Sequence, residues 1–175
     1  MRELLRLFGE IALSRKGPQD LPASPLLLAL TVAGYAVVAF AVNALLPSVD
    51  SWRVQLLVEI GFTLAWYAVM LRAFGKRERF LQTATAVFGY QLVLAPPFIA
   101  IISLSRRFAE DTSSPWQFPV AVIALALLIW IIRAGSYVLK AALELPMVAC
   151  VALIFAEILA SQLVLISLTP TAVAG

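Results

Sequence analysis

Two acidic side chains lie inside long apolar runs, where a carboxyl group could do chemistry. Glu59 interrupts one run, and Glu157 sits near the centre of another. A carboxyl group at that depth in a bilayer is costly, needs a hydrogen-bonding partner and is a candidate functional site. Thr63 and Tyr67 follow Glu59 at helical spacing, and Ser161 follows Glu157 by one turn. We therefore take Glu59, Glu157 and Ser161 as candidate polar sites within a membrane.

Two hypotheses account for these acids. The sharper one is a proton or cation relay across a helical bundle. The simpler one is that each carboxyl group is hydrogen-bonded to a Gln, Ser or Tyr of a neighbouring helix, or to a partner subunit. Two acids are few for a relay across a membrane, and Lys and Arg fall only near the ends of the apolar runs or outside them, so none lies at membrane depth as a counter-charge. The sequence therefore favours the simpler hypothesis.

The side-chain sets that enzymes need are missing from the sequence. There is no His, which removes the commonest general base and the commonest metal ligand. The three Asp residues are far apart along the chain, and Cys150 stands alone in an apolar run. No glycine-rich phosphate loop precedes a helix. We therefore expect no enzyme activity, no bound metal and no cofactor.

A second set of candidates lies in the stretch FLQTATAVFGYQLVLAPPFIAI. Its polar and small residues fall near one helical face, and such a face normally turns toward another helix because an unpaired amide in hydrocarbon is costly. We expect this face to pack inward, against this chain or a partner. Its members are Gln82, Thr85, Gly89 and Pro96, with Tyr90 beside them.

The pair Pro96 and Pro97 raises a separate question. If the helix runs through these residues, the carbonyl groups of Leu92 and Val93 lose their usual donors. A hydroxyl group, a water molecule or a ligand must then satisfy them. The alternative, which the sequence favours, is a simple kink near the outer surface.

Just before this stretch lies a dense basic cluster. Lys76, Arg77 and Arg79 fall between two apolar runs, and Arg72 at the end of the first run flanks them. They are candidate contacts for anionic lipid head groups, because each basic residue at such a surface contributes roughly 1 kcal/mol of attraction. The simpler interpretation, a cytoplasmic anchor that fixes the topology, is favoured.

The composition predicts that lipid surrounds most of the chain. Of 175 residues, 62% are hydrophobic and 13% are charged, whereas about a quarter of the residues in a soluble domain are charged. A helix needs about 20 apolar residues to cross a bilayer. We expect an all-α polytopic membrane protein with a five-helix transmembrane bundle. The five runs are residues 25–46, 52–74, 80–102, 118–132 (extendable toward 137) and 145–168.

The first residues predict a short amphipathic helix. Leu4, Leu7, Phe8 and Ile11 fall on one face, as in a helix that lies on the inner leaflet. A frayed cytoplasmic tail is the alternative. Charged residues interrupt the stretch, so it does not read as a signal peptide. The predicted parts are residues 1–24 (interfacial helix and linker), 25–168 (five-span domain) and 169–175 (tail).

The basic residues also predict an orientation. With five spans, ten of the thirteen Lys and Arg residues fall on the side of the amino terminus. Arg53, Arg106 and Arg107 fall on the other side. Cytoplasmic loops carry the excess of Lys and Arg, so we expect a cytoplasmic amino terminus and an outer carboxyl terminus. Because the basic residues follow this pattern, the net charge of +3 does not indicate nucleic-acid binding.

The proline-containing stretch resembles a segment of the Yip-domain family of multi-spanning membrane proteins. In that segment an aromatic residue and a Thr precede a Gly-Tyr pair and a downstream Pro. The stretch LLIWIIRAGSYVLKAALELP is similar to the family's fourth span and the loop into the last span. Five helices and a cytoplasmic amino terminus agree with the family. The residues that carry the resemblance are Phe80, Thr83, Gly89, Tyr90 and Pro96.

What the resemblance implies is limited. Eukaryotic Yip proteins associate with Rab GTPases in vesicle traffic, largely through a longer cytoplasmic amino-terminal region. This chain has only about 24 residues there, so that role is not carried over. It looks more like the short bacterial members, which implies a bacterial inner (plasma) membrane.

Two functional hypotheses follow. The first is a non-enzymatic subunit, scaffold or assembly partner that packs its helices against another integral membrane protein and contacts membrane lipids. The second is a small carrier or channel-forming homo-oligomer that uses Glu59 and Glu157. Co-purification of a stoichiometric partner favours the first, and ion flux through a homo-oligomer favours the second.

Overall fold

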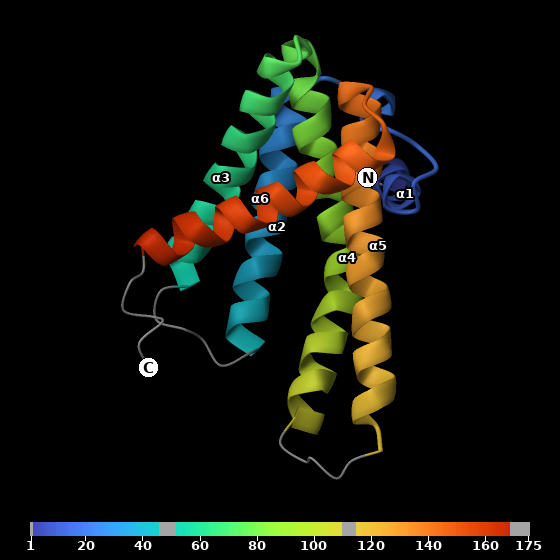
Figure 1. Ribbon diagram of the computed structural model, residues 1–175, viewed down its shortest axis with the longest axis vertical. Helices are drawn as coiled ribbons and strands as arrows, with labels where there is room; N and C mark the ends of the chain where they lie inside the picture. Colours follow the sequence, from blue (N-terminus) through green and yellow to red (C-terminus); the bar gives the residue numbers. More distant parts are fainter. Residues whose placement is uncertain (1, 46–51, 110–114, 169–175) are drawn as a thin grey trace.

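The computed structural model describes residues 2–45, 52–109 and 115–168, which form helices without any strand. Five of the described helices, α2 to α6, are long and apolar enough to cross a membrane. The expected all-α polytopic fold is thereby confirmed, whereas the predicted tail at 169–175 lies outside the described residues. The helices in Figure 1 are α1 (Arg2–Ala12), η1 (Pro18–Asp20), α2 (Pro25–Leu45), α3 (Trp52–Ala73), η2 (Arg77–Arg79), α4 (Phe80–Ala109), α5 (Gln117–Leu143) and α6 (Met147–Leu168).

Local sequence signals fix several helix ends. Pro25 begins α2, where its missing N–H is not needed, and the Ser24 hydroxyl group accepts a bond of 3.3 Å from the Leu27 N–H. At the end of α3, Gly75 has a φ of 70°. That conformation lets the Lys76 N–H reach the Leu71 carbonyl at 2.7 Å and close the helix.

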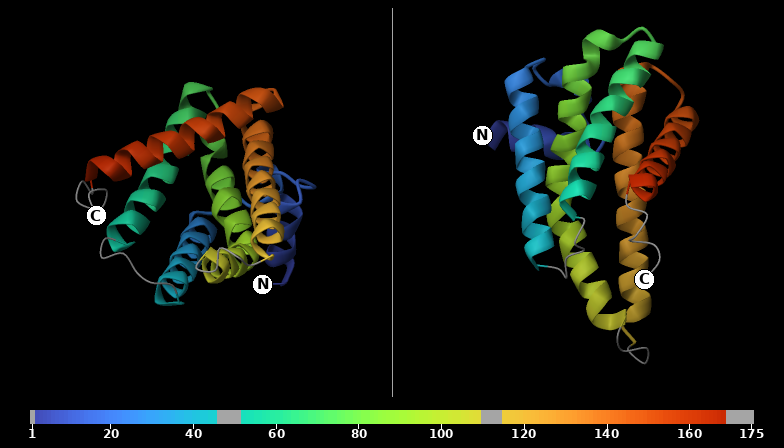
Figure 2. Two further views of the ribbon diagram at one scale, coloured as in Figure 1. Left: turned by 60° about the horizontal axis from the view of Figure 1, so that its bottom comes forward. Right: turned by 90° about the vertical axis from the view of Figure 1, so that its left-hand side faces the viewer.

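Helix α4 lies at the centre of the molecule. It contacts α1, α2, α3 and α5, and every residue from Thr83 to Tyr90 is buried. Helix α6 packs against α3 and α5 and crosses the molecule at a steep angle to both (Figures 1 and 2). Helices α4 and α5 extend together beyond the ends of α2 and α3 (Figure 1).

Two spans are longer than the sequence predicted. Helix α4 continues to Ala109 instead of ending near residue 102, and Pro96 and Pro97 lie inside it. Helix α5 continues to Leu143. The side chains of its charged residues Arg133 and Lys140 are exposed and not buried against the bundle, so they do not interrupt the helix.

The face of α4 that was predicted to pack inward is buried or half-buried in the first half of the helix and exposed at Pro96. Thr85 and Gly89 are buried and Gln82 is half-buried, but Pro96 is exposed. The difference has a structural cause, since the second half of α4 extends past most of its neighbours and no longer has helices on every side.

Helix α1 forms where predicted, but much of its apolar face packs against protein. Phe8 and Ile11 are buried against the bundle, whereas an interfacial helix would place them in lipid. The Phe8 ring lies where a Cβ atom on Gly89 would be. Because Gly89 has no side chain, it leaves the space that the ring occupies. The indole N–H of Trp130 in α5 donates a bond of 2.7 Å to the carbonyl oxygen of Ala12.

Candidate functional site

A pocket of about 560 Å³ lies among α2, α3, α4 and α5. Its volume is that of a small-molecule site, and its lining is mainly apolar with a few polar groups, as such sites usually are. One acidic residue, Glu59, lines it and is exposed. The other polar residues of the lining are Tyr35, Asn43, Gln55, Tyr90, Gln91 and Arg106.

Glu59 is held in place by a residue of another helix. The hydroxyl group of Tyr35 in α2 donates a hydrogen bond of 2.5 Å to Glu59 Oε1. The Tyr35 ring in turn packs edge-to-face on Phe88 of α4, with ring centroids 5.4 Å apart. Three helices thus fix the position of one carboxyl group at the pocket wall.

The second acid forms a similar pair outside the pocket. The hydroxyl group of Tyr67 in α3 donates a bond of 3.1 Å to Glu157 Oε2 in α6. Tyr67 is fully buried, and Glu157 is half-buried. The sequence placed Tyr67 near Glu59 because both are on α3, but each of them pairs with a different helix.

Tyr90 lies between the two Tyr–Glu pairs. It lines the pocket and is within electrostatic range of Tyr35, Tyr67 and Glu157. Its hydroxyl oxygen lies 3.0 Å from the point where a Cβ atom on Gly135 would be. Gly135 in α5 therefore leaves the space that Tyr90 occupies.

Both acids bond to a Tyr of a neighbouring helix, which agrees with the simpler of the two hypotheses. Ser161, the candidate polar residue one turn from Glu157, donates its hydroxyl group to the Ile158 carbonyl of its own helix at 2.8 Å. A Ser hydroxyl group one turn from Glu157 can bond back to its own helix, and Tyr67 already reaches the acid.

The polar residues near the start of α4 are satisfied within this chain. The Gln82 amide donates a bond of 2.7 Å to the Leu21 carbonyl and so ties the segment after η1 to α4. The Thr85 hydroxyl group donates to the Leu81 carbonyl, also at 2.7 Å. The face expected to engage a partner protein is therefore occupied by this chain's own segments.

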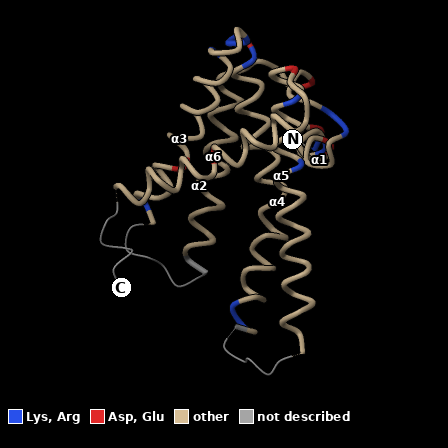
Figure 3. The backbone as a smooth tube through the Cα atoms, in the orientation of Figure 1, with Lys and Arg blue, Asp and Glu red and all other residues tan. Residues whose placement is uncertain are grey.

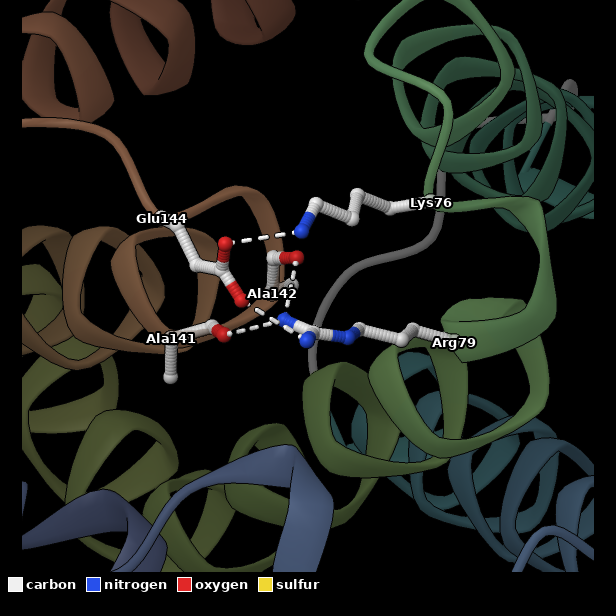
Figure 4. Close-up of polar contacts among 5 residues, drawn as sticks. All are labelled: Lys76, Arg79, Ala141, Ala142 and Glu144. Carbon is white, nitrogen blue, oxygen red and sulfur yellow. Dashed lines mark hydrogen bonds and ion pairs between the residues drawn. The ribbon is translucent and has the colours of Figure 1, made fainter.

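Two members of the basic cluster form ion pairs with α5 instead of standing free at a lipid surface. Lys76 Nζ and Arg79 Nη2 each lie 2.7 Å from a carboxyl oxygen of Glu144, and Arg79 Nη1 donates to the carbonyl groups of Ala141 and Ala142 (Figure 4). Lys76 and Arg79 hold the pKa of Glu144 below its ordinary value by hydrogen bonding to its carboxylate. Of the predicted lipid contacts, Arg72 and Arg77 are the exposed ones.

The Glu144 side chain is aimed by an unusual backbone. Its φ is 60°, a left-handed conformation that usually falls to Gly at a helix end. In this conformation its N–H bonds to the Lys140 carbonyl at 2.9 Å and closes α5. The ion pairs and the Arg79 bonds to the last carbonyl groups of α5 offset the strain.

Sequence reasoning missed the roles of four residues of these networks. Tyr35 carries a hydroxyl group inside an uncharged apolar run. A lone polar group in such a run could have marked Tyr35 as a partner for an acid. Gln91 is an amide in an apolar run and could have been found in the same way. Tyr67 was noted only for its helical spacing from Glu59, and Glu144 gave no local signal because its partners are more than sixty positions away.

Within the described ranges no group of three His, Cys, Asp or Glu residues could hold a metal ion. The arrangement offers binding through a carboxyl group, tyrosine hydroxyl groups and an amide. Comparison of the chain with protein-family models, with curated proteins and with solved structures found no match.

Proposed function

We propose that this chain is a non-enzymatic membrane protein that binds a small molecule in the pocket beside Glu59 and carries it or retains it within the membrane. One observation supports this proposal most strongly. An acid that only joined two helices would be shielded further, as the half-buried Glu157 is, whereas Glu59 is exposed and lines a pocket of ligand size. Placing a carboxyl group in an apolar setting costs free energy, and a ligand that pairs with the group offsets that cost.

The pocket's accessibility tests this proposal without knowledge of the ligand. In a Cys150→Ala background, Ala95→Cys places a thiol in the pocket lining. We expect it to react with N-ethylmaleimide in native membranes, because water that reaches the pocket allows the thiolate to form. Ala39→Trp fills the same pocket and should slow the reaction at least tenfold.

The matched control is Leu57→Cys, which lies on the same bundle but is 72% exposed and outside the pocket lining. Lipid on that surface keeps a thiol protonated, so its reaction should be slow. Equal rates at residues 57 and 95, or no reaction at residue 95, would overturn the proposed function.

A role as a subunit, scaffold or assembly partner of a membrane complex is the second proposal. The α4 face on which it first rested is covered by this chain, so the outer face of α6 takes its place. Val148, Leu159 and Leu163 are exposed there. A stoichiometric partner in mild detergent, lost when Leu159 and Leu163 are both replaced by Ala, would support this role.

We also propose a bacterial inner membrane location with the amino terminus in the cytoplasm. Lys and Arg gather around the turn between α3 and α4 and near α1, with few at the far end of α4 (Figure 3). This distribution supports the orientation by the excess of basic residues on the cytoplasmic side. Reporters fused to the two ends should be active in opposite compartments, and activity in one compartment would contradict it. The Yip-domain resemblance around Gly89 and Tyr90 stays a prediction.

A further inference from the structure

The end of the pocket near Glu59 offers acceptors of hydrogen bonds. Glu59 carries the acidic charge, and Tyr35 binds only one of its oxygens in the structure. Gln91 also lines this pocket, and its Oε1 is buried without a hydrogen-bond partner among the described residues. Gln91 lies one turn after Phe88, the residue on which the Tyr35 ring packs, so it comes from the same part of the fold as the Tyr35–Glu59 pair. A ligand group that fits here brings N–H donors and a positive charge.

The rest of the pocket suits an apolar body. Leu94, Phe98 and Ile131 line it, and the aromatic rings of Trp52 and Tyr90 form further parts of the wall. Aromatic faces attract organic cations, and apolar walls bind the hydrocarbon part of a ligand. The pocket's size therefore admits an amphiphilic molecule rather than a bare metal ion or a proton alone.

One basic residue of the lining lies at the opposite end. Arg106 is fifteen residues beyond Gln91 along α4, or about 22 Å along the helix axis. At that separation it does not compensate the charge of Glu59, and it repels a cation from its own end. The cation is therefore directed to Glu59, while a phosphate or carboxylate at Arg106 is the competing occupant.

We propose that the pocket binds a lipophilic organic ammonium ion that keeps at least one N–H, with the nitrogen at Glu59 and Gln91 and the apolar body along α4. This inference rests on the proposed function and names the class of ligand for the same pocket.

Dansyl cadaverine, a fluorescent primary amine, is a suitable probe for this ligand class. Its binding is measured with the protein in lipid nanodiscs, against empty nanodiscs. The Glu59→Gln variant should weaken binding at least tenfold, and Gln91→Leu about threefold. Glu157→Gln makes the same chemical change outside the pocket and should leave binding unchanged. Ala39→Trp, which blocks the pocket and leaves Glu59 in place, should also abolish binding.

Two analogues of the probe separate charge from hydrogen bonding. The N-acetylated probe is neutral and should show no difference between the wild-type protein and Glu59→Gln. The trimethylammonium probe keeps the charge without N–H donors and should bind more weakly than the amine, with no loss in Gln91→Leu. Equal binding of the amine and the acetylated probe, or unchanged amine binding in Glu59→Gln, would overturn the inference.

The competing occupant gives a different result. A dansyl fatty acid whose binding is lost in Arg106→Gln but kept in Glu59→Gln would assign the pocket to an anionic lipid and overturn the ammonium ligand. A reactive thiol at Ala95→Cys without amine binding would refute the ligand class and leave the pocket function intact. An unreactive thiol there would refute the pocket function itself.

Discussion

The hydroxyl group of Tyr67 donates a hydrogen bond of 3.1 Å to Glu157, a residue ninety positions away, and so joins α3 to α6. Replacement of Tyr67 by Phe should lower the free energy of unfolding by about 1 kcal/mol, the usual size for a bond between membrane helices. Unfolding by sodium dodecyl sulfate in mixed micelles measures the change. The control is Ser161→Ala, because that hydroxyl group bonds only within α6.

A double-mutant cycle isolates the pair. Glu157→Gln retains an acceptor for Tyr67, so its own loss should be smaller. In the double variant the loss should be less than the sum of the two single losses. Additive losses would mean that the two side chains do not interact.

The contact of the Phe8 ring with Gly89 predicts that α1 stays packed on α4 only if residue 89 has no side chain. A Leu at residue 89 would occupy the position of the Phe8 ring and should displace α1 from α4. We expect the amide protons of α1 to exchange at least tenfold faster in Gly89→Leu. Gly61→Leu is the matched control, because nothing lies within 4 Å of a Cβ atom at that helical position. Unchanged exchange in both variants would show that α1 does not depend on this contact.

The lowered pKa of Glu144 predicts a loss of stability in acid. Because the pKa is lower in the folded state than in the unfolded chain, the stabilisation is present above the unfolded value of about 4.3 and is lost as the pH falls through the folded value. Thermal unfolding between roughly pH 6 and pH 3 should show a decline that is shallower in Glu144→Gln.

A second acid contributes to the same decline. Lys16 and Arg6 lower the pKa of Glu10 by hydrogen bonding to its carboxylate. Glu10→Gln should therefore remove a further part of the pH dependence, and the two variants together should remove more than either alone. A decline of unchanged steepness in Glu144→Gln would contradict the role of its ion pairs.

Gly75 and Gly61 should respond to Ala in opposite directions. Gly75 has a φ of 70° with open space around it, so Gly75→Ala should cost about 1 kcal/mol of stability from the backbone alone. Gly61 is in the interior of α3, also with open space, and Gly61→Ala should add about 0.5 to 1 kcal/mol. Unfolding in mixed micelles compares the two variants, and a change of the same sign in both would refute the explanation.

The spans were predictable because apolar side chains must meet lipid or protein all around a membrane helix. Their ends were less predictable. The residues after Ile102 in α4, such as Ser103, Arg106 and Arg107, have the composition of a polar loop, yet they continue the helix. Polar side chains have adequate helix propensity, and no residue there forces the helix to end.

The sequence predicted which acidic residues belong to the site, but it did not predict the residues that bond to them. Glu59 is visible as a charge within an apolar run, but its bond to Tyr35 depends on how α2 packs against α3. The same holds for Lys76 and Arg79, whose positions suggested a lipid surface. Their partner Glu144 comes close only because α4 and α5 lie side by side. Contacts between distant segments depend on packing that no local pattern encodes.

The bond between Trp130 and Ala12 spans 118 positions of the chain. A ribosome adding about 5 to 20 residues per second needs roughly 6 to 24 s to make that length. Helix α1 therefore emerges long before Trp130 in α5 has been synthesised. The bond to Trp130 therefore forms late, and until then a bound factor or the bilayer must cover the apolar side chains of α1.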